Sequence, residues 1–259
     1  STSRTFRGIS DNLTRGGPLM GTPSGWQYQA RLTGNPGARV SWNTQFTYFQ
    51  DELDGWRRQL NGDLKFQLAP RWQASFGLAH SRSVNTQQYV TTRDDGPGVT
   101  YGNRYIFSHI ARSQLSAPLR LNYAFTPDLT IEIYAEPFAA SGRYSDFGEL
   151  PAPETRDLRT YGTDGTTMTR QDDGSSLVTD GATSFTINSL DFNRLSLRSN
   201  VVIRWEWAPG STFYLIWQQN RAESIDTGQP VGFDSFGDAI TAPGDNFLAL
   251  KASYWIGFR

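Results

Sequence analysis

Charged side chains at every second position are the residues of this sequence whose spacing could support chemistry. From Asp191 to Gln218, arginine, asparagine and glutamate alternate with leucine, valine, isoleucine and tryptophan. Such strict alternation places the two sets on opposite faces of a β-strand. Several other segments alternate in the same way. Together they place on polar strand faces Arg31, Asp63, Lys65, Arg120, Glu132, Tyr134, Glu136, Arg198, Arg204, Glu206 and Lys251.

Two interpretations of this polar set remain open. If the opposite, apolar faces meet lipid, the set lines a lumen, and rings of charged side chains select solutes in pores. Alternatively, opposite charges on adjacent strands form a ladder of interior ion pairs, each stabilising the fold by about 0.2–1 kcal/mol. The set holds six cations and four acids, a net charge of +2, which would favour anions in an open pore.

Covalent chemistry has little support in the sequence. His80 and His109 are the two histidines, and no motif marks either as a catalytic base beside a serine and a carboxylate. Phosphate-binding and dinucleotide-binding fingerprints are absent. We therefore expect a protein that is not an enzyme, with no catalytic residues and no cofactor.

Repeated aspartate-glycine pairs offer oxygen atoms of the kind that bind Ca²⁺. They occur at Asp94-Asp95-Gly96, Asp164-Gly165, Asp172-Asp173-Gly174 and Asp180-Gly181. Their spacing differs from that of an EF-hand loop, and the same pair is an ordinary turn signal. The sequence therefore predicts turns at these positions and no metal site.

The overall composition narrows the class of protein. The 259 residues carry a formal net charge of −1 with a pI of about 6.1, and no basic stripe points to nucleic acid. The absence of cysteine leaves out disulfide and thiol chemistry. Mean hydropathy is −0.52, and no run of about 18 apolar residues could form a membrane helix. Barrel strands escape this criterion, because they average lipid-facing and lumen-facing residues.

The spacing of turns suggests how the strands connect. Four short turns contain proline: Gly34–Gly37, Ala69–Arg71, Thr126–Asp128 and Ala208–Gly210. The connections between them are longer and more polar, and outer-membrane barrels have short periplasmic turns and long outer loops. We therefore predict an all-β fold, an antiparallel up-and-down transmembrane β-barrel.

The prediction treats residues 1–259 as a single β-barrel region. Residues 1–24 lack periodicity and are expected to form a loop, and residues 25–259 to form strands with long loops at about 85–104, 143–190 and 222–245. The alternation gives about nine strands, whereas bacterial single-chain barrels usually have an even number. We therefore expect the C-terminal part of a larger barrel, paired with missing N-terminal strands or with a partner chain.

Aromatic side chains end the apolar faces beside the short turns. This set comprises Trp72, Tyr123, Trp205, Trp207, Tyr254 and Phe258. Tryptophan and tyrosine concentrate where a membrane meets water. Platforms for stacking sugars are the alternative, but these should point into the lumen or lie on loops, and Tyr134 is a better candidate. A lipid-interface girdle is therefore the favoured interpretation.

Four segments spread along the chain carry a family resemblance. They are Tyr101–Leu150, LTRGGPLM (Leu13–Met20), DFNRLSLRSNVVIRWEWAPGST (Asp191–Thr212) and the closing LKASYWIGFR (Leu250–Arg259). They resemble a bacterial outer-membrane family of uncharacterised function, whose members join an N-terminal carbohydrate-binding-like module of the family-nine type to a C-terminal β-barrel. The resemblance implies an outer-membrane barrel of which this chain is the C-terminal portion. It implies no particular activity.

Together these observations predict a porin-like protein that passes or captures a solute at a bacterial outer membrane without covalent chemistry. Membrane lipid is the expected surrounding, and a small carbohydrate-derived solute is one candidate. The competing class is a plugged structural barrel that anchors an exported module or a larger assembly. A soluble barrel with an internal ligand is the third, although soluble strands usually have about 5–6 residues and these are longer.

Overall fold

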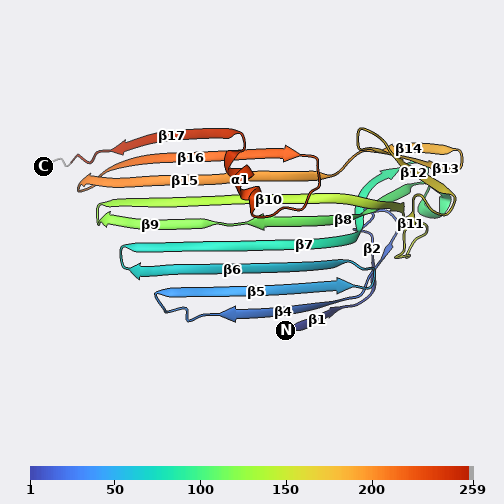
Figure 1. Cartoon of the computed structure of the whole chain (residues 1–259), viewed down its shortest axis with the longest axis horizontal. Coiled ribbons are helices and arrows are strands. Elements are labelled where there is room, and N and C mark those ends of the chain that lie inside the picture. The colour runs from blue at the N-terminus through green and yellow to red at the C-terminus, as the bar shows by residue number, and fades with distance from the viewer. Residues whose placement is uncertain (257–259) are drawn as a thin grey trace.

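The computed structural model describes residues 1–256, and most of them form one antiparallel sheet (Figure 1). Its strand order is β1-β4-β5-β6-β7-β8-β10-β15-β16-β17, with β9 between β7 and β10, and β11 at the end of β10. The strands are β1 (Thr2–Thr5), β4 (Gly25–Thr33), β5 (Val40–Asp51), β6 (Trp56–Ala69), β7 (Trp72–Arg93), β8 (Arg104–Ser116), β9 (Leu119–Thr126), β10 (Leu129–Glu149), β11 (Arg159–Thr160), β15 (Phe192–Ala208), β16 (Ser211–Ile225) and β17 (Gly244–Ser253). The all-β, antiparallel class that the sequence predicts is confirmed.

A proline divides one of the long strands into two parts. β8 and β9 follow one another along the sheet, and the break includes Pro118, which has no N–H for the ladder. The amide of Ala117 donates to the carbonyl of Pro137 (3.1 Å), and the amide of Gly77 donates to the carbonyl of Pro118 (2.8 Å). A Cβ atom on Gly77 would lie 2.9 Å from the Pro118 ring, so the facing strand needs glycine there. With β8 and β9 taken as one, nine long strands run from β4 to β17, as the alternation predicts.

The connections differ between the two ends of the strands. The turns β4–β5, β6–β7, β9–β10 and β15–β16 lie at one end, at the left of Figure 1, and each contains the expected proline. In the β15–β16 turn, Gly210 has φ +76°, a left-handed conformation that glycine adopts without steric cost. The long connections gather at the other end, which we call the loop end.

Secondary structure at the loop end is more extensive than expected. The segment 1–24, expected as a loop, contains three short strands, and the segments 85–104, 143–190 and 222–245 each begin with the continuation of a long strand. The additional elements are β2 (Gly8–Ser10), β3 (Met20–Thr22), the 3-10 helix η1 (Gly98–Thr100), β12 (Thr166–Arg170), β13 (Ser176–Asp180), β14 (Thr183–Ile187) and α1 (Asp234–Thr241). No helix among residues 1–256 is long and apolar enough to span a membrane.

Bulges explain why the strand continuations escaped the sequence pattern. The pairing register shifts between Asn85 and Gln88 of β7, and between Ser145 and Gly148 of β10. A bulge places two residues of one strand opposite one residue of its partner, so the alternation of faces loses its phase while pairing continues. β7 therefore remains a strand as far as Arg93, beyond the point where its alternation ends.

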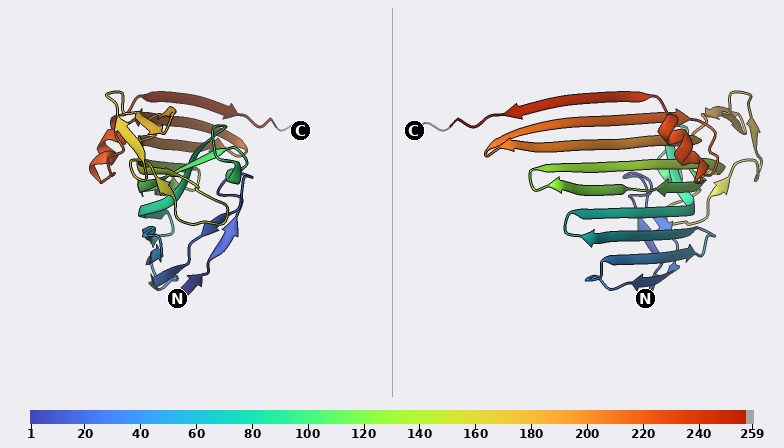
Figure 2. Two further views of the ribbon diagram at one scale, coloured as in Figure 1. Left: turned by 90° about the vertical axis from the view of Figure 1, so that its right-hand side faces the viewer. Right: turned by 60° about the vertical axis from the view of Figure 1, so that its left-hand side comes forward.

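The sheet is curved, and different elements cover its two sides near the loop end. Helix α1 lies against the convex side, whereas the N-terminal strands cross the concave side (Figure 2). Ala239 of α1 and Val231 before it pack on Leu115, Ala139 and Leu195 of the sheet. These three leucine and alanine side chains share the apolar strand face, so the convex face is the apolar one.

The sheet has two free edges within residues 1–256. β17 pairs with β16 alone, and the outer side of β4 pairs with the short β1 over Gly25 to Tyr28. No pairing joins β17 to β1 or β4 in the part of the chain that the structure describes. These strands by themselves therefore form an open, curved wall.

Candidate functional site

The eleven residues of the predicted polar set lie on one face of the sheet, because the strand register connects them. Directly paired residues of an antiparallel ladder project to the same side. Arg120 pairs with Tyr134, and Tyr214 pairs with both Arg204 and Lys251. Tracing the pairs from strand to strand adds Arg31, Asp63, Lys65, Glu132, Glu136, Arg198 and Glu206. This face is opposite to the one that α1 covers, so it is the concave face (Figure 2).

The middle of the concave face combines aromatic and charged side chains from β9, β10 and β15. The hydroxyl of Tyr134 donates to the carboxylate of Glu136, and the Arg120 guanidinium lies 4.6 Å from the centre of the Tyr134 ring. Arg198 is directly opposite Glu136 in the ladder. A cavity of about 250 Å³ opens here, lined by Glu136, Phe138, Ser196 and Arg198. A carboxylate, a guanidinium and an aromatic ring are thus available to a solute within one cavity.

Two residues that line this cavity, Ser196 and Phe138, are absent from the predicted set, and Phe138 is the larger of them. On β10, Phe138 lies two positions after Glu136 and four positions after Tyr134, and it therefore shares their face. The even spacing from Glu136 was enough to place Phe138 on the polar face. The signal was hidden because the run Glu136-Pro137-Phe138-Ala139 breaks the alternation of polar and apolar residue types.

Two further parts of the concave face also gather predicted residues. Arg31, Asp63 and Lys65 line a cavity of about 120 Å³ beside the first short turn. At the opposite edge of the sheet, the Lys251 ammonium lies 5.8 Å from the centre of the Tyr214 ring. The face therefore carries charge from its β4 side to its β17 side.

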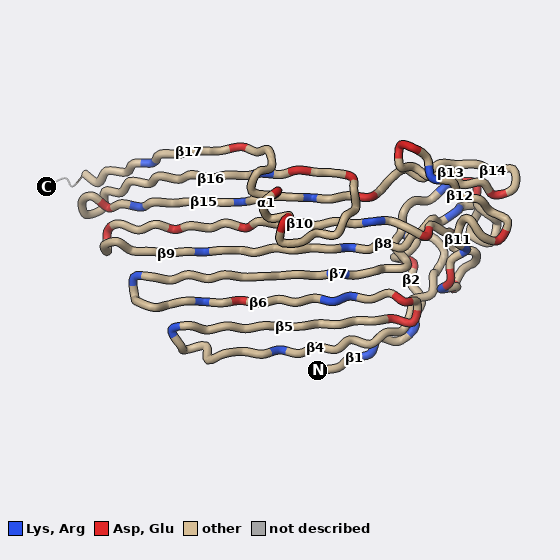
Figure 3. The backbone as a smooth tube through the Cα atoms, viewed as in Figure 1, with Lys and Arg blue, Asp and Glu red and all other residues tan. Residues whose placement is uncertain are grey.

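The ladder of cross-strand ion pairs, one of the two interpretations of the polar set, does not form within residues 1–256. The one ion pair inside the set joins Arg204 to Glu206 on the same strand, at 2.8 Å. Glu136 accepts its hydrogen bond from Tyr134 on its own strand and makes no ion pair with Arg198 opposite. Basic residues recur along the long strands (Figure 3). Most cations of the concave face thus lack an acidic partner among the described residues, which leaves a positive surface.

The convex face is apolar and largely uncovered. Trp26, Trp205, Trp217, Leu248 and Leu250 are between 43% and 67% exposed. Soluble monomers rarely expose contiguous apolar patches larger than a few hundred Å², and larger patches mark protein or membrane interaction. This face therefore needs an apolar partner.

The predicted girdle residues gather at the short-turn end of the sheet. Trp72 pairs with Tyr123 across β7 and β9, and the rings of Trp205 and Trp207 contact each other with centres 6.4 Å apart. Tyr254 follows the end of β17 and is exposed. The sixth predicted residue, Phe258, lies outside the described residues.

The apolar band crosses the strands obliquely. On β4 its loop-side limit is Trp26, which pairs with Gln50 of β5, whereas on β16 the limit is Trp217. Following the directly paired residues from Trp217 across β15, β10, β9, β7 and β6 leads to Val40 of β5. Val40 is ten residues from Gln50 along that strand. The limit of the band thus moves ten residues along the strand direction, which is about 34 Å at about 3.4 Å per residue. Over the same stretch it crosses seven strand spacings from β4 to β16, which is also about 34 Å at about 4.8 Å per strand. The uncovered part of the band is therefore inclined at about 45° to the strands, because Leu115 and Leu195 beyond this line are covered by Val231 and α1. The short turns are staggered in the same direction (Figure 1).

A second cluster of charged groups lies at the loop end, outside the predicted set. Arg104 and Arg159 each bridge Glu149 and Asp180, with nitrogen–oxygen distances of 2.7 to 3.0 Å. The hydroxyl of Tyr161 donates to Glu149 (3.1 Å). Hydrogen bonds from Arg159 and Arg104 lower the pKa of Asp180 to about 2. Burial by itself would lower the pKa of Arg104, but the bond to Asp180 and the charge of Glu149 raise it, so Arg104 keeps its positive charge.

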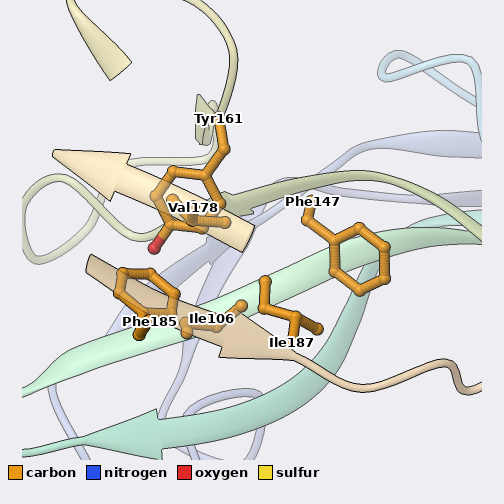
Figure 4. Close-up of a cluster of buried hydrophobic side chains, with 6 residues drawn as sticks. All are labelled: Ile106, Phe147, Tyr161, Val178, Phe185 and Ile187. Atoms are coloured by element: carbon orange, nitrogen blue, oxygen red, sulfur yellow. The ribbon is translucent and has the colours of Figure 1, made fainter. Parts of the chain in front are cut away.

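An apolar core adjoins this charge cluster and attaches the β12–β14 sheet to the end of the main sheet. It consists of Ile106, Phe147, Tyr161, Val178, Phe185 and Ile187 (Figure 4). The two arginines and two acids of the cluster neutralise one another, so its role is to fasten these strands. Sequence reasoning missed it because Arg104 and Asp180 are 76 residues apart and no local pattern marks either.

The two histidines do not assemble a nucleophilic triad in the described chain. His109 Nδ1 lies 3.4 Å from Asp146 Oδ2, and the hydroxyl of Ser145 donates to the same carboxylate oxygen at 2.8 Å. A triad needs the serine hydroxyl on the imidazole and the carboxylate behind it, whereas here both groups meet the carboxylate. His80 lies on the apolar face, opposite Leu60 and Leu115.

Three of the four predicted aspartate-glycine turns are confirmed, whereas Asp94-Asp95-Gly96 lies in an irregular segment. Gly165, Gly174 and Gly181 have positive φ values, as turn glycines do. Within residues 1–256, no three side chains of histidine, aspartate or glutamate come close enough to hold a metal ion together.

A curved antiparallel sheet with one apolar and one charged face defines the class of this chain. Residues 19–259 match the model of the family described as Domain of unknown function (DUF5916), and the chain belongs to that family. No curated protein and no solved structure matches it.

Proposed function

We propose that this chain is part of the wall of a bacterial outer-membrane β-barrel that passes or captures a solute without covalent chemistry. The observation that carries the proposal is the pair of faces: an exposed apolar convex face and a charged concave face. A soluble antiparallel sheet buries its apolar face and shows water its polar one. A membrane barrel does the reverse, with lipid outside and a polar lumen.

The oblique apolar band supports the membrane location independently. Strands of outer-membrane barrels are tilted by about 35–45° from the membrane normal, so a band of lipid-facing residues must cross the strands at that angle. The inclination of about 45° between Trp26 and Trp217 fits this requirement. A soluble sheet has no comparable reason to stagger its apolar residues along a diagonal.

Further strands complete the wall in this proposal. The edge of β17 leaves the backbone groups of Gly244–Ser253 without a partner on one side, and β4 is covered only as far as Gln29 by β1 and Ser1. Unpaired backbone groups cost several kcal/mol each in hydrocarbon, so membrane sheets close on themselves. Strands from the rest of the protein or from a partner chain therefore pair with β4 and β17.

The concave face favours an anionic solute. Arg198 lines the central cavity and Arg120 lies over the Tyr134 ring on the same face, and neither arginine has an acidic partner among residues 1–256. Aromatic rings beside guanidinium groups, as at Tyr134 and Phe138, also suit the apolar face of a sugar ring. The resemblance to a family with a carbohydrate-binding-like module makes an acidic saccharide the first solute to test.

A plugged structural barrel is the second candidate, and the N-terminal segment favours it. Gln87 donates to the carbonyls of Gly21 (3.2 Å) and Arg156 (2.9 Å), which ties β3 to the loop end on the concave side. Met20 is fully buried in a core with Tyr105, Phe107 and Leu150. An element fixed inside the wall would narrow or close a lumen.

A second contact holds the same segment. Arg7 donates to Glu52, which also accepts from the amide of Ser24 (3.0 Å). The hydrogen bond from Arg7 is the main cause that lowers the pKa of Glu52 to about 2, so this contact keeps its charge at neutral pH.

Single-channel recording on the full-length protein in a planar bilayer tests the proposal. Discrete conductance steps are expected for a solute pathway. A membrane-inserted protein without steps, which conducts only after residues 7–24 are excised, would identify the plugged barrel. A protein that does not enter the bilayer would refute both.

A further inference from the structure

Two arginines face each other on the convex side of the sheet. Arg58 of β6 and Arg82 of β7 are directly paired in the ladder, and both are exposed. They share the parity of Leu60 and Leu78, so they project from the apolar face and not into the concave side. Like charges directly opposite each other destabilise a sheet. Their juxtaposition therefore calls for an anion between them.

No acidic side chain among the described residues forms an ion pair with either arginine. The convex positions paired with them on the outer strands are Tyr48 and Ser113. The preceding row on this face holds Trp56 and its partners Gln50 and Val84. None of the residues paired with the two arginines, or of the preceding row, is acidic, so the arginine pair is a compact positive site.

Aromatic rings hold one of the two guanidinium groups. The Arg58 Cζ atom lies 5.1 Å from the centre of the Trp56 ring and 5.7 Å from that of Tyr48. Such contacts orient a guanidinium and leave its N–H groups free to donate. Arg4 repeats the arrangement farther along the same rim, with its Cζ atom 5.4 Å from the Trp26 ring.

The position of the pair selects the source of the anion. Arg58 lies one row beyond Leu60, at the loop-side limit of the apolar band, where lipid hydrocarbon would give way to headgroups. A soluble solute would instead meet the concave face, whose cations point the other way. Arginine binds phosphate through two parallel N–H donors, and basic residues at this depth attract anionic lipids.

We propose that Arg58 and Arg82 hold the phosphate of an anionic lipid headgroup at the loop-side membrane interface. The inference rests on the proposed membrane location and adds a specific lipid contact to it. Trp56 and Tyr48 form the aromatic rim of this site.

The test compares lipid preference in nanodiscs that contain the full-length protein, phosphatidylcholine and a minor fraction of phosphatidic acid. The phosphatidic acid retained by the protein is measured by native mass spectrometry. The double variant Arg58→Gln, Arg82→Gln should lower the preference by about fivefold for each arginine. The matched control is Arg57→Gln, Arg112→Gln: both arginines are directly paired with Ser83 and project from the concave face, so this variant removes the same charge and should keep the preference.

Three outcomes would overturn the inference. Equal loss in the two double variants would show a general charge effect without a site, and displacement by millimolar inorganic phosphate would identify a site for soluble anions. Retention of the full preference in the Arg58→Gln, Arg82→Gln variant would also exclude the site. In each case the protein still inserts, so the proposed function stands. A protein that stays outside the lipid would refute the membrane location itself.

Discussion

Replacing Ile203 with arginine tests the assignment of the convex face to lipid. Ile203 pairs with Ile131 and Leu215, so both lateral neighbours on its face are apolar. It lies four residues from Trp207, the last girdle residue of β15, or about 14 Å along the strand at 3.4 Å per residue. At an inclination of about 45° this is a depth of about 10 Å, close to the middle of an apolar band about 25 Å tall. The variant should lose about 2–4 kcal/mol of folding free energy in lipid.

The neighbouring residue provides the control. Val202 projects to the concave face and pairs with Glu132 and Ile216. Val202→Arg would place a cation opposite an acid, an arrangement that contributes about 0.2–1 kcal/mol of stability. The two variants differ by one position along the strand and add the same side chain. Their effects should therefore have opposite signs.

Urea titration of the full-length protein folded into lipid vesicles measures both variants, with the slope checked for constancy. Leu119→Arg on β9 should behave as Ile203→Arg does. If arginine is tolerated at Ile203 and Leu119 but not at Val202, the faces are reversed and the proposed lumen is the lipid surface.

Three further predictions concern the edges, the concave face and the loop end. Residues 1–259 expressed alone should aggregate or remain protease-sensitive in detergent, because the edge of β17 and the edge of β4 beyond Gln29 are unpaired. Neutralising Arg198 and Arg204 should shift the reversal potential in a salt gradient toward cation preference and cost some stability. The pKa of Asp180 is lowered to about 2 in the folded chain, below its ordinary value of 3.8. The ionised carboxylate therefore stabilises the docking of β12–β14 fully above about pH 4, and this stabilisation is lost as the pH falls through 2. Hydrogen exchange in β13 reports that loss, and Asp180→Asn should reproduce it at neutral pH.

Each of these predictions has a clear contrary result. A monodisperse, heat-resistant monomer of residues 1–259 would mean that the edges need no partner. Unchanged selectivity in the Arg198 and Arg204 variants would remove both residues from a conducting lumen and favour the plugged barrel. Equal protection of β13 at pH 5 and at pH 2 would show that the apolar core alone docks that sheet.

The faces of the long strands were predictable because alternation is a local signal. Val201 and Val202 are identical residues on opposite faces, and only the pattern of their neighbours assigns them. The register adds what alternation lacks, since it connects the polar face of one strand to that of the next. The short turns made the order of the strands predictable as well, because each turn keeps its two flanking strands antiparallel and adjacent.

The ion pairs were not predictable, because they depend on competition between partners. Arg198 is opposite Glu136 as the charges suggested, but Tyr134 lies two positions away on the same strand and donates to that carboxylate. At the loop end, Arg104 meets Asp180 only through tertiary packing. A short helix such as α1 likewise owes its place to the apolar sheet beneath it, and its own eight residues give no long periodic signal.

The inclination of the strands determines how much perimeter each one provides. A strand about 4.8 Å wide and inclined at about 45° occupies about 7 Å of circumference, so nine strands supply about 60 Å. Barrels of eight strands are filled by their own side chains, whereas those of 16 to 18 strands enclose water. Each pair of strands inserted between β17 and β4 widens the bore by about 4 Å. In the proposed barrel, this chain would therefore supply the charged face of the wall, and the strands that pair with its two edges would set the aperture.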